Sequence, residues 1–594
     1  MFVSDLLNIN EHRAATLFQY ACDVRSRYEG WSPIKIAVYL YHRDREYVLE
    51  SLVLMVTRFV PDTAAMEDVV KVIDGFLDEM LALPVSFPKK ILESMALLKA
   101  ALDAFAKDPS MGGIVTPEQA QKLGIDEEIV AMHVEQLRKE RNRLGDLFYY
   151  TTARWRLTAD ETLVLLRSLQ AVEAVDVASI SMLCSLMLNL DHVLVSPDSV
   201  RLALTGSDFA SFQREIEGST WKVWGMQAVA WTQWTCFLHY CASDVIDEGV
   251  VDDAFRSAVA SNYDEASRRW RDNVGKKRDV YLFMCDYVIP FRKTKQEKAK
   301  SPQAISEDIE GEVRDLYVGQ VERWVDGLIV FLRWALKDIK CSDEDATRAA
   351  DQAERKALMP TAKGPFANER AVAPTKSITA WEALLFLITI LYRDRPDAAI
   401  SFWGDPSQMD MDQVDEASSF QTPEKQAFVR MASDVRTSRF LKAFIHMLAS
   451  LATGKHSAHQ VHMKLNADPA DSQMGSVLWT TFFTSLNTAM TSNTLSVSLV
   501  LLSKPQVTSN PGCIPKIWAF CRIDCPNPPA PSDIRSGCGT ASPPSSSLGL
   551  AVSDMRVPRS KSSKHLSKIL KLTETISHRS SGSSKCRINT LENT

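Results

Sequence analysis

Glycine is scarce in this sequence, at 23 of 594 residues. Because glycine-rich loops cradle phosphates and form tight turns, this scarcity argues against a fold built on phosphate-binding loops or on many hairpins. Alternating strand patterns bounded by Asn-Gly or Asp-Gly are essentially absent as well. These absences leave a helical fold as the expectation.

Long apolar runs and targeting segments are also missing. The best apolar run, residues 383–391, is far shorter than the roughly 18–20 residues that a membrane span needs. The N-terminal segment lacks the basic region and apolar stretch of a secretory signal. We therefore expect an intracellular protein with no membrane insertion.

Neither the net charge nor the cysteines mark a special class of protein. The formal net charge is only -6, which indicates neither a nucleic-acid binder nor an acidic tail protein. The 11 cysteines do not have the density of a disulfide framework, and those of the first 341 residues lie in apolar or helical contexts. We expect these cysteines to be reduced thiols of a core.

Helical periodicity dominates most of the chain. Apolar residues recur at three- and four-residue steps in residues 67–83, 312–337 and 438–451, which places them on one face of a helix. Thr158 and Glu161 have the spacing of a capping box. No fixed repeat period is present. We therefore predict an all-α fold, an irregular α-solenoid of HEAT/ARM-like helical stacks with a disordered C-terminal tail.

Polar and proline-rich stretches divide the chain into six predicted segments. They are an N-terminal α-solenoid (1–292), a linker (293–311), a long solenoid helix (312–340), a flexible loop (341–378), a continuing α-solenoid (379–493) and a Ser/Pro-rich tail (494–594). The tail holds 20 Ser, 10 Pro, 13 basic and 5 acidic residues. This composition predicts disorder. Because the change is abrupt, our hypothesis is that the tail is encoded out of frame, through a retained intron or a frameshift.

Two histidine-containing clusters could suggest a metal site. Cys236, His239 and Cys241 lie close together, but they fall short of the tetrahedral set that structural zinc uses. They lie inside an aromatic helix, so we interpret them as core residues. His456, His459 and His462 are spaced by three residues without a nearby acid, so we interpret them as a partly exposed helix surface.

Other polar clusters carry no recognisable chemistry either. The acidic run at Asp410, Asp412 and Asp415 lacks the glycine and the closing glutamate of a calcium loop. The tail cysteines and the tail's basic run have neither zinc-finger spacing nor stacking aromatics. No nucleophile elbow or paired-carboxylate motif occurs. We therefore assign no catalytic, cofactor-binding or metal-binding residues, expect no cofactor, and do not expect an enzyme.

The most informative internal stretch is residues 221–240, WKVWGMQAVAWTQWTCFLHY. Its tryptophans and aliphatic residues occupy most sides of a helix. A helix of this kind is buried between neighbours, as in the middle of a helical stack.

Several helical stretches, taken in order, resemble one known family. They are HRDREYVLESL (42–52), LRKERNRLGDLF (137–148), MQAVAWTQWTCFL (226–238), the segment 381–403 with its YRDRPD and closing FW, and residues 439–465 followed by WTTFFTSL (479–486). Together they are similar to the N-terminal portion of the large inner-ring scaffold nucleoporins of the nuclear pore complex, the 205/192/188-kilodalton nucleoporin family. The resemblance extends over about residues 1–490.

The resemblance implies an α-solenoid at the nuclear pore complex of the nuclear envelope. It implies linker and adaptor nucleoporins as partners, with transport factors contacted indirectly and without direct nucleic-acid binding, and it carries over no catalytic residue. The function that we expect is structural, a scaffold that binds linker segments and supports nucleocytoplasmic transport. The alternative is a karyopherin-like soluble nuclear transport receptor, which is also an all-helical solenoid.

Overall fold

The computed structural model is helical throughout the part of the chain that it describes. The described residues are 2–57, 67–81, 85–107, 127–191, 204–242, 252–289, 305–358, 377–403, 416–434 and 438–466. Within these ranges there are no strands, and the predicted all-α class is confirmed. No helix in these ranges is long and apolar enough to cross a membrane.

The helices follow one another with short connections. The first half comprises α1 (Phe2–Leu7), α2 (Glu11–Asp23), α3 (Pro33–Thr57), α4 (Glu67–Leu81), α5 (Phe87–Lys107), α7 (Glu127–Arg154), α8 (Ala159–Gln170), α9 (Val177–Asn189), α10 (Gly206–Glu217) and α11 (Trp224–Ala242). The second half comprises α12 (Asp253–Trp270), α13 (Asp279–Phe283), α15 (Ile305–Phe331), α16 (Arg333–Leu358), α17 (Ala380–Tyr392), α18 (Pro396–Trp403), α19 (Glu416–Ser433), α20 (Ser438–Leu451) and α21 (Lys455–Asn466).

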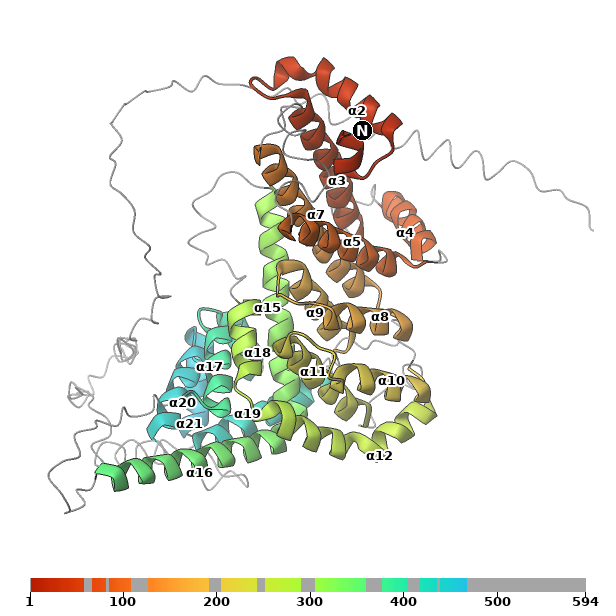
Figure 1. Ribbon diagram of the computed structural model, residues 1–594. Coiled ribbons are helices and arrows are strands. Elements are labelled where there is room, and N and C mark those ends of the chain that lie inside the picture. The colour runs from red at the N-terminus through yellow and green to blue at the C-terminus, as the bar shows by residue number, and fades with distance from the viewer. Residues whose placement is uncertain are drawn as a thin grey trace, which may run out of the picture. The chain divides into compact units, whose positions relative to one another are not determined.

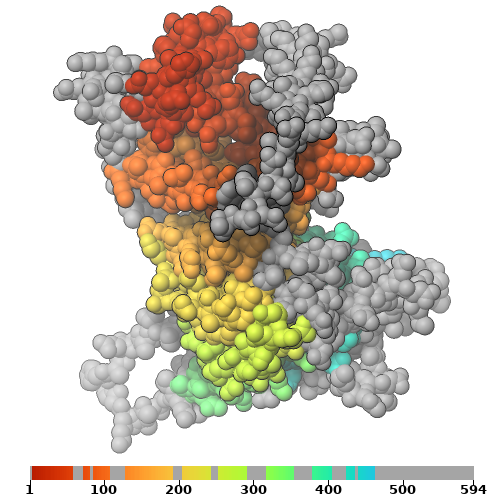
Figure 2. Space-filling view, turned by 90° about the vertical axis from the view of Figure 1, so that its right-hand side faces the viewer, coloured from red at the N-terminus to blue at the C-terminus, as the bar shows by residue number. Residues whose placement is uncertain are grey.

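Residues 1–499 form one unit in which each helix packs mainly on helices close to it in sequence. Helix α7 packs on α3, α5 and α9, α11 packs on α12, and α17 packs on α20. Figure 1 shows this succession from α2 to α12, and in Figure 2 the colours of successive helices follow one another along the visible face. Such neighbour-on-neighbour packing is the property that defines a solenoid.

The core is continuous and is densest at α9 and α11. Every residue of α9 from Ala178 to Asn189 is buried. The Trp234 ring on α11 stacks on Phe212 at 5.3 Å and on Phe237 at 5.8 Å between ring centroids. Both helices are enclosed by neighbours, as a helix that is apolar on most sides requires.

Helix α15 connects the first half of the unit to the last helices. Its Tyr317 hydroxyl lies 2.7 Å from Ser181 Oγ on α9. Further along α15, Asp326 accepts a hydrogen bond from Lys425 Nζ on α19 at 2.8 Å, and both side chains are largely buried. Because charges taken out of water need a partner, this ion pair fixes how α19 lies on α15.

The ends of several helices agree with the sequence analysis. The Glu161 carboxylate accepts the Thr158 backbone N–H at 2.8 Å, and Thr158 Oγ1 accepts the Glu161 backbone N–H at 3.3 Å, so the predicted capping box is present. Around α15 and α16 the helix ends differ from the expected ones. Helix α15 begins at Ile305, and α16 continues to Leu358 through residues that we predicted as a loop. The Ala, Glu, Lys and Arg of that stretch are strong helix formers, which explains the extension.

Candidate functional site

The cysteines and histidine of α11 are core residues. Cys236 and Cys241 are 2% and 1% exposed, and burial raises the pKa of both thiols. The His239 imidazole contacts Ser267 Oγ on α12, and burial lowers the pKa of His239 to about 4. This placement agrees with the core interpretation of the Cys-His-Cys cluster.

The other polar clusters of the sequence are only partly described. Of the three histidines of α21, the structure describes the side chain of His459, which is exposed. Asp410, Asp412 and Asp415, the tail cysteines and the basic run lie outside the described residues. Among the residues that are described, no three His, Cys, Asp or Glu side chains are grouped so that they could hold a metal ion.

A groove that the sequence did not predict lies between α2 and α3. Helix α2 begins at Asn10, whose side chain accepts the Arg13 backbone N–H at 2.8 Å. After α2 the chain turns back at Gly30, which has a φ of 78° that few other residues adopt. The rings of Tyr28, Trp31 and Tyr39 pack on one another with centroids 5.5 to 5.9 Å apart and hold α3 against this turn.

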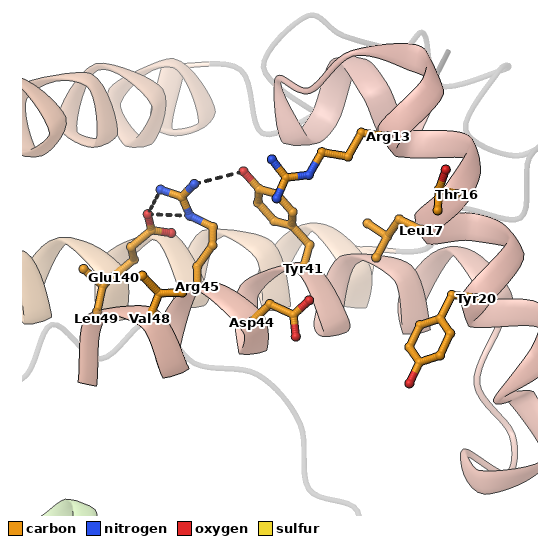
Figure 3. A pocket seen from close by; sticks show the side chains of 10 residues that line it. All are labelled: Arg13, Thr16, Leu17, Tyr20, Tyr41, Asp44, Arg45, Val48, Leu49 and Glu140. Carbon is orange, nitrogen blue, oxygen red and sulfur yellow. Dashed lines mark hydrogen bonds and ion pairs between the residues drawn. The ribbon is translucent and has the colours of Figure 1, made fainter. Parts of the chain in front are cut away.

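The groove has a volume of about 500 Å³. Its lining comes from three helices: Arg13, Thr16, Leu17 and Tyr20 from α2, Tyr41, Asp44, Arg45, Val48 and Leu49 from α3, and Glu140 from α7. Figure 3 shows the α2 side chains facing those of α3, with Glu140 at one end. The volume is in the range of pockets that enclose one or a few large side chains.

An ion pair closes the α7 end of the groove. Arg45 Nε donates to Glu140 Oε1 at 2.8 Å, Arg45 Nη2 donates to the same oxygen, and Nη1 donates to the Tyr41 hydroxyl at 3.3 Å (Figure 3). Burial alone would raise the pKa of Glu140, but the contact with His42 and the hydrogen bonds from Arg45 outweigh it, and the pKa is lowered. The Glu140 carboxylate is therefore ionised at neutral pH, and its charge is balanced by Arg45.

Behind this ion pair lies a buried histidine pair. His42 Nε2 on α3 and His133 Nδ1 on α7 are 2.8 Å apart, and both side chains are buried. Burial, and to a lesser degree the neighbouring His42, lower the pKa of His133 to about 3, although Glu140 opposes the shift. His133 is therefore neutral at physiological pH. Each imidazole pairs with the other, so the histidines connect α3 to α7 and face away from any substrate.

Apolar side chains at the groove are more exposed than is usual for their type. Tyr20 is 53% exposed and Val48 is 59% exposed, and both line the groove. Next to them, Tyr47 is 51% exposed and lies under the Arg43 guanidinium at 5.3 Å from the ring centroid. Exposed apolar surface that is gathered in a concave region is typical of a binding surface. The groove has no activated nucleophile, so its chemistry is that of docking.

Comparison with known proteins agrees with the resemblance found in the sequence. Residues 1–492 match the model of one protein family, described as nuclear pore complex scaffold, nucleoporins 186/192/205. The match covers every helix that the structure describes. A search of curated proteins found no match.

Proposed function

The chain belongs to the family of nuclear pore complex scaffold nucleoporins 186/192/205, and from this premise we propose that its helical stack binds linker segments of other nucleoporins and so supports nucleocytoplasmic transport. Membership makes the protein a scaffold component of the nuclear pore complex in the nuclear envelope. A scaffold component contacts other components of the pore. The proposal adds that these contacts include short linear segments held between helices.

The observation that carries the proposal is the family match over residues 1–492, which spans the whole described helical stack. Two features of the stack support it. A solenoid presents one groove after another along its surface, and such grooves accept amphipathic peptide segments. The groove between α2 and α3 is of this kind, because it is concave, apolar in its lower part and charged at its rim.

We also propose that the protein has no catalytic role. The family is a structural one. In the groove the most buried ionisable groups, Glu140 and His133, pair with other side chains of the same chain. Groups held in this way stabilise the contact between α3 and α7 and do not act on a substrate.

Cross-linking mass spectrometry on isolated nuclear envelopes tests the linker-binding proposal. The protein carries an N-terminal tag, and lysine cross-links are mapped to its helices and to the partner proteins. We expect cross-links from several helices to segments of other nucleoporins that lie outside their folded domains. Cross-links only to folded domains would refute linker binding, while leaving the scaffold role in place.

A further inference from the structure

The groove between α2 and α3 has the properties of a specific peptide site. It is formed by side chains of three helices, and its lower wall is fixed by the buried residues Leu49 and Glu140. Its upper wall and rim expose Tyr20 and Val48, which are large and would lose water on contact with a partner. Tyrosine is enriched among the residues that dominate binding energies.

Two charges at the groove are left open. Arg13 on α2 and Asp44 on α3 both line it and are both exposed, and within the described residues neither side chain has a hydrogen-bond or ion-pair partner. By contrast, Arg45 and Glu140 pair with each other. Figure 3 shows Arg13 entering from α2 and Asp44 from α3, with the apolar side chains between the two helices.

These open charges define what fits the groove. A ligand that offers only apolar surface would leave Arg13 and Asp44 partly desolvated without partners, which costs free energy. A ligand that carries an acidic group at the Arg13 side and a basic group at the Asp44 side would pair both. The apolar region between them accepts a branched aliphatic or aromatic side chain.

We propose that this groove is the docking site for one short amphipathic segment of another nucleoporin, with an apolar anchor between an acidic and a basic residue. The anchor occupies the space between Leu17, Tyr20 and Val48, the acidic residue pairs with Arg13, and the basic residue pairs with Asp44. Helix-in-groove recognition of this kind uses anchors spaced by three or four residues. The assignment deepens the proposed linker binding by naming the site and the chemistry of the segment.

Photo-cross-linking in cells identifies the occupant. The N-terminally tagged full chain carries p-benzoylphenylalanine at position 20 or 48, expressed from its native locus, and cross-linked peptides are sequenced by mass spectrometry. The control position is Leu97 on α5, which is 72% exposed and does not line the groove. We expect positions 20 and 48 to capture the same short nucleoporin segment and position 97 not to capture it.

Charge reversal then tests the chemistry. A synthetic peptide copied from the captured segment is titrated against the full chain. The substitution Arg13→Glu should weaken binding by about tenfold, and a peptide whose acidic residue is changed to lysine should recover most of that loss on the Arg13→Glu protein. The matched control is Arg214→Glu, an exposed arginine of α10, which should leave the affinity unchanged.

Three outcomes would overturn the assignment. The first is no more capture at positions 20 and 48 than at position 97. The second is capture only of this chain's own tail or of a second copy. The third is a captured peptide whose affinity does not respond to Arg13→Glu. In each case, a tagged wild-type chain that still marks the nuclear rim and still cross-links linker segments through other helices would leave the proposed function intact.

Discussion

Acidification should loosen the contact between α3 and α7, because His133 must stay neutral to remain buried there. The pKa of His133 is lowered to about 3 in the folded protein, whereas an unfolded histidine titrates near 6.5. Below the unfolded value, the unfolded state binds a proton that the folded state does not. The stabilising contribution of neutral His133 is therefore complete above about pH 6.5 and is lost progressively as the pH falls toward 3.

The size of the effect follows from these two pKa values. At pH 5 the folded group is still neutral and the unfolded group is protonated, so the loss is the distance from 6.5 to 5 multiplied by about 1.36 kcal/mol, or about 2 kcal/mol. Glu140 adds little in this window, since its pKa is lowered from a model value of 4.5 and its own contribution falls only at more acidic pH. The loss between pH 7 and 5 therefore reports mainly on the histidine.

Hydrogen exchange on the full chain measures this loss locally. After correction for intrinsic exchange rates, peptides covering residues 34–50 and 128–140 should lose protection by about 30-fold between pH 7 and pH 5. The variant His133→Asn keeps an acceptor for His42 but cannot be protonated, so it should lose much less. The control His12→Asn changes an exposed histidine of α2 and should behave like wild type. Equal pH dependence in wild type and His133→Asn would refute the reasoning.

Two further predictions concern the packing of the stack. Lys425→Met removes the cation that pairs with buried Asp326 and should destabilise the docking of α19 by about 3–5 kcal/mol, while adding Asp326→Leu should recover much of the loss; hydrogen exchange of residues 416–434 checks both, and unchanged protection in the single variant would contradict the role of the pair. Gly225→Ala would place a Cβ 2.4 Å from the Phe283 ring and should cost about 1–3 kcal/mol, whereas Gly319→Ala, with nothing within 4 Å, should be neutral or stabilising by up to about 1 kcal/mol; thermal unfolding compares them, and equal melting temperatures would refute the overpacking argument.

Local signals in the sequence were sufficient to predict the helices. The predicted helix over residues 438–451 coincides with α20, and the one over 67–83 ends two residues beyond α4, which is Glu67–Leu81. The capping box at Thr158 is present. These features depend on residues three or four positions apart, so the sequence alone contains them. The family resemblance is also confirmed, since residues 1–492 match the family.

The groove could not be predicted in the same way. Its charged end joins Arg45 to Glu140, and its histidine pair joins His42 to His133, so each contact spans more than 90 positions of sequence. On α3 the periodicity identifies the buried face through Val38, His42 and Leu49, but it does not say which helix covers that face or leaves a gap beside it. Contacts of this range follow from the packing of α2 and α7 on α3, which no local pattern encodes.

The central claim is that this chain is a scaffold component of the nuclear pore complex, and microscopy of the protein tagged at its N-terminus from the native locus tests it most directly. The account predicts a punctate nuclear rim that coincides with a marker of the pore and does not exchange with the cytoplasm over the life of the cell's interphase. A diffuse signal, or one that shuttles between nucleus and cytoplasm as a soluble transport receptor does, would contradict it.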